Sequence, residues 1–167
     1  MKLTKSFSYI KLGDMVRIRK ISNEVYEVFI NDKLVDDVVY DKRDELINYI
    51  KDKMTKIKDR INIYGFCKIK VYYKKGIGIF LEVIKFDDSV STTVLDLRVL
   101  IMENEKIYFE TEDYEIIKNC NDKRYMDERF YCIVDDSFDL VLEKVEFGNF
   151  IYGKDVIKVL NNSKILC

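Results

Sequence analysis

"INIYGFCKIKVYYKKGIGIFLEV", residues 61–83, is the stretch that decides how the chain is expected to fold. Its two halves alternate between apolar and polar side chains, which is typical of half-buried strands. Between the halves, Gly76 follows two lysines, and a glycine there can supply the positive φ that a tight turn requires. We therefore predict a β-hairpin with its tip at residues 74–76, and we expect Gly78 just inside the returning strand.

A Gly-x-Gly beside two lysines can also indicate a phosphate-binding loop. Such a loop needs a helix after its glycines, because the amides at the helix N-terminus meet the phosphate. Here the glycines are followed by another strand-like run. We therefore expect Lys74 and Lys75 to be exposed charges at a hairpin tip and not a phosphate clamp.

The segment before this hairpin predicts a long amphipathic helix over residues 41–60. Its apolar residues follow a 3.6-residue period, so they share one face of a helix, and Asp41 is suited to cap its first turn. These residues are Leu46, Ile47, Ile50, Met54, Ile57 and Ile61. Further upstream, residues 15–21 and 25–31 predict an antiparallel hairpin, and residues 33–40 predict a third short strand.

The segment after the hairpin begins with a polar run at 87–93 that resembles an internal boundary. Beyond it we predict a hairpin from residues 93–102 and 106–113, a second one turning at residues 127–128, and helices at about 137–152 and 155–161. The expected fold is α+β, an antiparallel sheet of hairpins with helices covering one face. The 167 residues should form one compact domain, with a basic sub-lobe at 1–87 and an acidic one at 94–167.

Composition excludes several kinds of chemistry. The chain has no His, Pro or Trp, and also no Ala or Gln, a bias typical of a low-GC bacterium or its phage. Without His, neither a Ser-His-Asp nor a Cys-His pair can form. The four cysteines are too scattered for a zinc site, so we expect buried free thiols, no structural metal, no cofactor and a reducing cytoplasm. No apolar run is long enough for a signal peptide or a membrane span.

Carboxylates remain as candidates for catalysis. Asp-Asp pairs occur at 36–37, 87–88 and 135–136, and an acidic run covers 110–115. Clustered carboxylates can hold Mg²⁺ for phosphoryl chemistry, although such pairs are also common in caps and turns. A carboxylate–metal hydrolase is therefore our third hypothesis for function.

Charge is the strongest nonlocal feature. Residues 1–75 carry 18 Lys and Arg against 11 Asp and Glu, a net charge of +7, whereas residues 76–167 carry a net charge of −8. If the strand after the long helix packs beside it, four lysines could form one continuous basic face, with Tyr72 as a stacking surface. These lysines are Lys51, Lys58, Lys68 and Lys70. The alternative hypothesis is therefore a nucleic-acid-binding module that uses the basic N-terminal half.

Residues 106–160 resemble the C-terminal domain of the MecA competence adaptor family. "KIYFETEDYEII" is similar to a strand that leads into an acidic turn and helix, and "RYMDERFYCIVDD" to a Tyr-rich strand pair. "LEKVEFGNFIYGKDVIKVL" resembles the closing segment, with Glu146, Phe147, Gly148 and Ile151 at its motif positions. The resemblance implies a non-enzymatic adaptor that presents substrates to a Clp-type AAA+ unfoldase. Our leading hypothesis is a cytoplasmic protein-binding or regulatory module whose partner is another protein.

Overall fold

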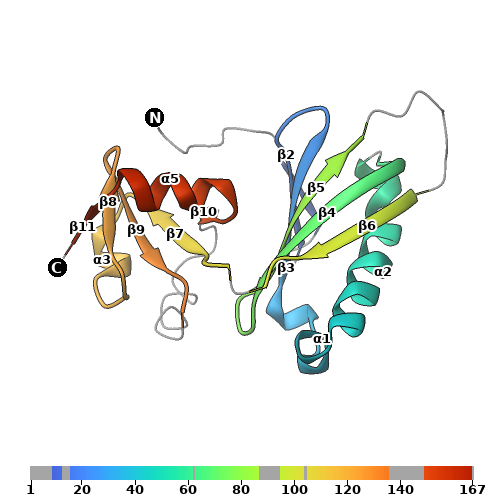
Figure 1. The fold of residues 1–167 in the computed structure, drawn as a ribbon, viewed down its shortest axis with the longest axis horizontal. Coiled ribbons are helices and arrows are strands. Elements are labelled where there is room, and N and C mark those ends of the chain that lie inside the picture. The colour runs from blue at the N-terminus through green and yellow to red at the C-terminus, as the bar shows by residue number, and fades with distance from the viewer. Residues whose placement is uncertain are drawn as a thin grey trace. The chain divides into compact units, whose positions relative to one another are not determined.

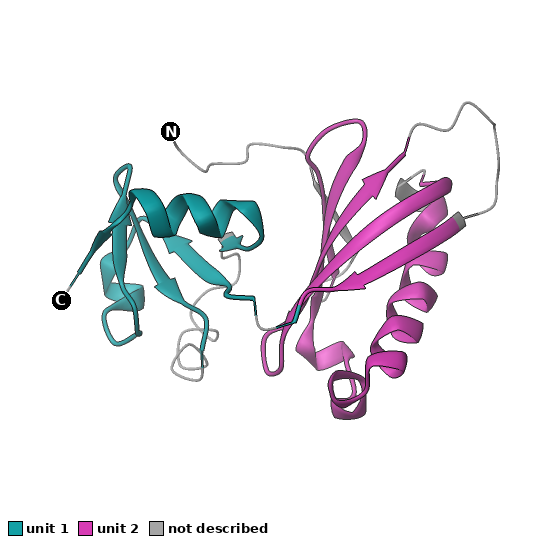
Figure 2. Cartoon of the chain, viewed as in Figure 1, with its two compact units in different colours: residues 1–4, 103–167 teal, residues 5–102 magenta. Residues whose placement is uncertain are grey.

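The structure, a computed structural model, describes residues 9–12, 16–61, 63–86, 95–103, 105–135 and 149–166 (Figure 1). The chain divides into two compact units, and the division falls after Met102 (Figure 2). Unit 2 covers residues 5–102, and unit 1 consists mainly of residues 103–167. Each unit contains its own sheet and helices, which confirms the α+β class. The division comes later than the polar segment at 87–93.

Unit 2 is built on a six-stranded sheet with the strand order β1-β2-β3-β5-β4-β6. All neighbouring strands are antiparallel except β4 and β6, which are parallel. The strands are β1 Tyr9–Leu12, β2 Val16–Lys20, β3 Val25–Asn31, β4 Gly65–Lys74, β5 Gly78–Lys85 and β6 Leu95–Ile101. The β2–β3 and β4–β5 hairpins confirm the two predictions made for residues 15–31 and 61–83.

Two glycines shape the tip of the β4–β5 hairpin. Gly76 has φ +92°, as the turn prediction requires, and Gly78 has φ +144°. A Cβ added to Gly78 would lie 2.2 Å from the carbonyl oxygen of Ile30 on β3. Gly78 is therefore needed for the close approach of β3 and β5, which is a tighter constraint than the turn itself.

A long helix, α2 (Arg43–Ile61), covers one face of this sheet. Four residues of its apolar stripe, Leu46, Ile50, Met54 and Ile57, are buried in one cluster with the inward-facing residues of the strands, and Ile50 and Met54 are fully buried. The helix starts later than predicted, because Lys42 has an extended backbone and separates α2 from a short helix, α1 (Asp37–Asp41). Asp41 therefore ends α1 and does not cap the long helix.

The third strand predicted at 33–40 is wrong. A 3₁₀ turn, η1 (Asp32–Leu34), and α1 occupy this segment. Burial of Val39 and Tyr40 against the core around α2 stabilises a helical turn there, although the β-branched run favours a strand locally.

The hairpin predicted from residues 93–102 and 106–113 is also wrong. β6 pairs with β4 in the sheet of unit 2, whereas β7 (Tyr108–Thr111) belongs to the other sheet. Both segments do form strands, but their partners lie far away in the sequence. Local alternation predicts a strand without saying which strand it pairs with.

Unit 1 has a five-stranded antiparallel sheet with the order β10-β7-β9-β8-β11. Its further strands are β8 Arg124–Met126, β9 Arg129–Ile133, β10 Asn149–Ile151 and β11 Lys164–Ile165. The β8–β9 hairpin turns at Asp127 and Glu128, as predicted, and the structure shows that both residues have positive φ. A short helix, α3 (Tyr114–Ile117), follows β7.

The C-terminal helices are partly as predicted. α5 (Lys154–Asn162) confirms the helix expected at 155–161, and it packs on the sheet of unit 1 through Val156 and Val159. The helix expected at 137–152 is wrong at its end, because residues 149–151 form β10 and pair with β7. Residues 137–148 lie outside the described part of the chain. No helix among the described residues is long and apolar enough to span a membrane.

Candidate functional site

The four lysines of the predicted basic face do not share a face. Cys67, Ile69 and Val71 of β4 pack in the core on the side of α2. Lys68 and Lys70 alternate with them and therefore project from the opposite, helix-free side of the sheet. Lys51 and Lys58 lie on α2, so the sheet separates the two pairs. The continuous basic face predicted from the sequence is wrong, because it assumed a side-by-side helix and strand.

The central row of charged residues on the helix-free side of the sheet is paired within the sheet. Glu27 on β3 and Glu82 on β5 lie directly opposite each other, and Arg19 and Lys70 flank them on the neighbouring strands. Arg19 lies 3.8 Å from Glu27, and Lys70 lies 3.9 Å from Glu82. Two carboxylates at the centre of this row repel phosphate, so the row is unsuited to a nucleic-acid backbone.

The tyrosine predicted as a stacking surface is buried. Tyr72 is only 4% exposed, and its neighbour across the strand, Phe80, is 2% exposed. Phe80 in turn packs on Phe29, whose ring lies under the guanidinium of Arg17. A base cannot stack on rings that are already covered.

The hairpin tip does not form a phosphate cradle. The backbone N–H of Gly76 donates a hydrogen bond of 3.0 Å to the carboxylate of Asp32, and the N–H of Ile77 donates to the carbonyl of Lys74. A carboxylate therefore occupies the place that a phosphate oxygen would need. Lys75 is exposed at the tip, as predicted, whereas Lys74 is half-buried.

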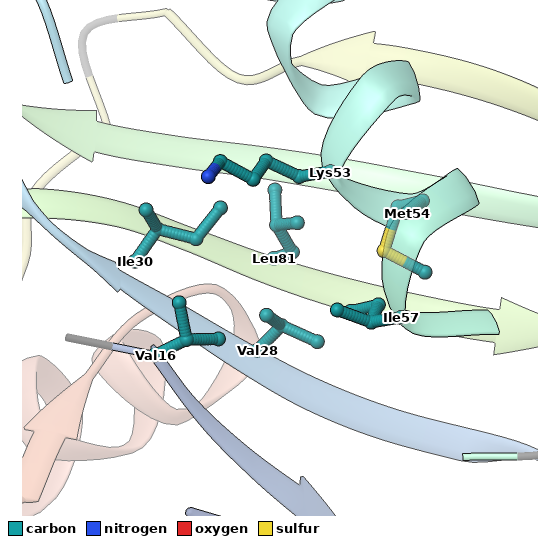
Figure 3. Close-up of a pocket in the computed structure, with 7 residues that line it drawn as sticks. All are labelled: Val16, Val28, Ile30, Lys53, Met54, Ile57 and Leu81. Carbon is teal, nitrogen blue, oxygen red and sulfur yellow. The ribbon is translucent and has the colours of Figure 1, made fainter. Parts of the chain in front are cut away.

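One cavity of unit 2 is lined almost entirely by apolar side chains. It lies between α2 and strands β2, β3 and β5, and it has a volume of about 20 Å³, enough for roughly one water molecule (Figure 3). The side chain of Lys53 extends across it. Its lining residues are Val16, Val28, Ile30, Lys53, Met54, Ile57 and Leu81. The cavity is too small for an organic ligand and is a defect of packing.

The edge strand β6 offers an interaction surface that the sequence did not indicate. It is the last strand of the six-stranded sheet, it is seven residues long, and no described residue pairs with its outer side. The N–H of Met102 donates to the carbonyl of Val71 on β4, at 2.8 Å. Because backbone groups alternate in direction along a strand, those of Leu97, Val99 and Ile101 point outward from the sheet.

The side chains of β6 divide between the two faces of the sheet. Leu97, Val99 and Ile101 pack partly buried against the core under α2. Asp96 and Arg98 lie on the helix-free face, and neither forms an ion pair with another described residue. Arg98 lies directly opposite Lys68 on β4, so two positive charges are neighbours at this edge. Sequence alternation predicted this strand, but its position at an edge depends on pairing across the sheet.

In unit 1, Ile151 is the described residue of the predicted binding motif, and it belongs to the core. Ile151 is 3% exposed and packs in the core with Tyr108, Tyr131 and Val156. It therefore has no surface to offer a partner. Glu146, Phe147 and Gly148 lie outside the described residues.

Unit 1 also contains a buried polar network. The Glu110 carboxylate, with no exposed area, accepts a hydrogen bond of 2.8 Å from the hydroxyl of Tyr131 and lies 3.3 Å from Arg129. Burial, and then the hydrogen bond to Glu110, raise the pKa of Tyr131. Every member of this network has a partner, and Arg129 also reaches Glu112 at 3.0 Å. The network is suited to holding the strands together and leaves no group poised for acid–base work.

The cysteines and carboxylates give no metal site in the described part of the chain. Cys67 and Cys132 are buried free thiols, as predicted, and Cys120 is a third. Burial raises the pKa of Cys132, which keeps it protonated and unreactive. No cluster of three or more metal-ligating side chains occurs among the described residues. Comparison of the chain with protein-family models, with curated proteins and with solved structures finds no match.

Proposed function

We propose that this chain is a non-enzymatic protein-binding module that takes up an extended segment of a protein partner at the edge of β6. The observation that carries the proposal is the outer side of β6, where residues 95, 97, 99 and 101 direct backbone groups away from the sheet. Extended segments bind such edges by adding a strand, because main-chain hydrogen bonds supply affinity and side chains supply specificity.

The side chains of β6 favour an amphipathic partner strand. On the face of α2, the edge is apolar through Leu97, Val99 and Ile101. On the other face it carries the charges of Asp96 and Arg98. A partner strand with alternating apolar and charged residues would continue both faces of the sheet.

The charge distribution argues against the alternative, a nucleic-acid-binding module. Lys70 is engaged by Glu82, and the sheet separates Lys68 from Lys51 and Lys58. Ion pairing and separation both lower the local positive potential that would attract phosphates. The more specific version of our proposal, an adaptor for a Clp-type AAA+ unfoldase, is supported by the sequence resemblance of residues 106–160.

A peptide-display experiment tests the proposal. The immobilised chain is used to select from a library of random peptides of about 12 residues, long enough to pair with the whole of β6, and we expect peptides with alternating apolar residues. Binding of these peptides should be lost in Val99→Pro, because proline removes one outward N–H without removing a bond to β4. Val99→Thr is the matched control, since threonine keeps both the β-branched shape and the N–H.

Two outcomes would contradict the proposal. One is peptide binding that Val99→Pro leaves unchanged while the variant stays folded by circular dichroism. The other is micromolar oligonucleotide binding at physiological salt that Lys68→Glu and Arg98→Glu abolish. If Val99→Pro unfolds, the test is instead amide hydrogen exchange of the wild-type chain at Leu97, Val99 and Ile101. Bound peptide should slow exchange at these amides, and unchanged exchange rates would contradict the proposal equally.

A further inference from the structure

We infer that the partner strand at β6 is β6 of a second copy of this chain, paired antiparallel about a two-fold axis at Leu97. The inference rests on the proposed function, since it names the partner of the same edge. Its starting point is geometric. Only residues 95, 97, 99 and 101 of the strand direct backbone groups outward, so these residues of one copy must face the same set in the other.

Two-fold symmetry leaves three registers that pair five or more residues of the strand. They are centred on Leu97, on Arg98 and on Val99. Each register brings outward backbone groups of both copies together, so main-chain hydrogen bonding does not choose between them. The charged side chains on the helix-free face distinguish the three registers.

The register centred on Leu97 places Asp96 of each copy opposite Arg98 of the other, which gives two cross-strand ion pairs. The register centred on Arg98 places two arginines opposite each other, and like charges in directly opposed positions are destabilising. The register centred on Val99 places Arg98 opposite Leu100 and leaves both charges without a partner across the interface. Charge complementarity therefore selects the axis at Leu97.

The arrangement also relieves a repulsion within each copy. Arg98 lies opposite Lys68 on β4, and neither has an acidic partner among the described residues. In the dimer, Asp96 of the second copy stands on the other side of Arg98 and offsets this positive pair. On the opposite face, Leu97 of one copy meets Leu97 of the other, so apolar side chains also meet across the interface.

Charge-reversal variants test the register. Sedimentation velocity of the full chain should show a dimer for the wild type. Asp96→Arg and Arg98→Glu should each weaken it by about tenfold or more, because two attractive pairs become two repulsive ones.

A mixture of these two variants should form a heterodimer. The arginine introduced at position 96 of one copy then faces the glutamate introduced at position 98 of the other, and the second pair keeps the native Arg98 opposite the native Asp96. Native mass spectrometry distinguishes this heterodimer by its mass.

The double variant Asp96→Arg with Arg98→Glu should dimerise again, because it restores both pairs with their signs exchanged. Lys56→Glu, on the exposed side of α2, is the matched control for net charge and should leave the dimer unchanged. Circular dichroism of each variant excludes unfolding as the cause of a monomer.

Several results would overturn the inference. They are a monomeric wild type at all concentrations, a dimer that charge reversal does not affect, a mixture that forms no heterodimer, and an assembly that grows beyond two copies. A monomer that still binds displayed peptides through β6 would overturn the dimer and leave the proposed function standing. A dimer that Val99→Pro leaves intact would overturn the inferred dimer, and displayed-peptide binding that the same variant leaves unchanged would overturn the proposed function as well.

Discussion

The two units hold their sheets together by different means. In unit 2, apolar residues of α2 pack on apolar residues of the strands, and no charged residue in the described part of this unit is buried. In unit 1, Glu110 and two tyrosine hydroxyls are buried within the sheet and are joined to partners by hydrogen bonds. Unit 2 therefore depends on apolar burial, whereas unit 1 also depends on complete pairing of its buried polar groups.

The edges of the two sheets differ as well. The outer strands of unit 1, β10 and β11, are three and two residues long. β6 of unit 2 is seven residues long. Short edge strands protect a sheet from pairing with other chains, and the chain has no proline with which to block a long one. Among the described strands, β6 is therefore the long edge that stays open to a partner.

Glu110→Ala should give the largest effect and would test the polar character of unit 1. It leaves Arg129 and the hydroxyl of Tyr131 without their shared buried partner, and we expect a loss of about 3–5 kcal/mol in unfolding free energy. Urea denaturation measures it. Glu112→Ala removes an exposed partner of the same arginine and should cost under about 1 kcal/mol. An equal loss of unfolding free energy in Glu110→Ala and Glu112→Ala would contradict the expectation that burial makes the Glu110 contacts more stabilising.

Ile50→Ala tests the apolar core of unit 2. Ile50 is fully buried at the centre of the α2 stripe, so the variant should lose about 2–5 kcal/mol through lost transfer energy and a new cavity. The same denaturation measurement applies. Ile157→Ala, on a side chain that is 59% exposed, is the control and should change stability little. A small loss of unfolding free energy in Ile50→Ala would mean that the α2 stripe is not packed as described.

Gly78→Ala tests the close approach of β3 and β5. The new Cβ would meet the carbonyl oxygen of Ile30 at 2.2 Å in a backbone conformation that other residues rarely adopt. We expect a loss of about 3 kcal/mol. Gly76→Ala, in the exposed turn, should cost only about 1–2 kcal/mol. If Gly76→Ala lowered the midpoint of urea denaturation more than Gly78→Ala did, the turn would be the tighter constraint.

Alkaline pH should weaken unit 1 through its buried tyrosines. Burial, and then the hydrogen bond to Asp122, raise the pKa of Tyr108 to about 12 from an ordinary value of 10.0. The folded state therefore keeps this proton longer than the unfolded state does. The resulting stability, about 2–3 kcal/mol, is fully present below a pH of about 10 and is lost as the pH rises through about 12.

Denaturation midpoints measured from about pH 8 to about pH 12, a range that spans both pKa values, check this expectation. Tyr108→Phe removes the titrating hydroxyl, so its stability should fall less steeply over the same range. Tyr125→Phe, on an exposed side chain, is the matched control and should follow the wild type. Parallel curves for the wild type and Tyr108→Phe would contradict the assignment.

Val28→Ile should give the smallest effect and would refine the description of the unit 2 core. Val28 lines the cavity of about 20 Å³, which has room for part of one additional methyl group. We expect a gain of under about 1 kcal/mol, measured by thermal unfolding. Ile69→Leu, away from the cavity lining, changes shape without filling space and should give no gain. A loss of stability in Val28→Ile would mean that the cavity cannot accept the extra methyl group.

The sequence alone determined the elements whose periodicity is local. The alternation of residues 61–83 predicted β4, β5 and their turn, and the 3.6-residue stripe around Ile50 predicted α2. Both succeed because each residue's environment repeats within a few positions along the chain, so burial leaves a regular pattern. The two-residue turn between β8 and β9 was predictable for the same reason.

Only the tertiary structure decided which elements meet. It paired β6 with β4, assigned residues 108–111 to a second sheet, and set Lys68 and Lys51 on opposite sides of unit 2. It also placed Asp96 and Arg98 at an open edge, which makes them candidates for recognition. Strand pairing joins residues that are distant in sequence, and its free energy comes from hydrogen bonds and packing that form only when both strands are in place. The local sequence pattern therefore cannot predict which strands pair.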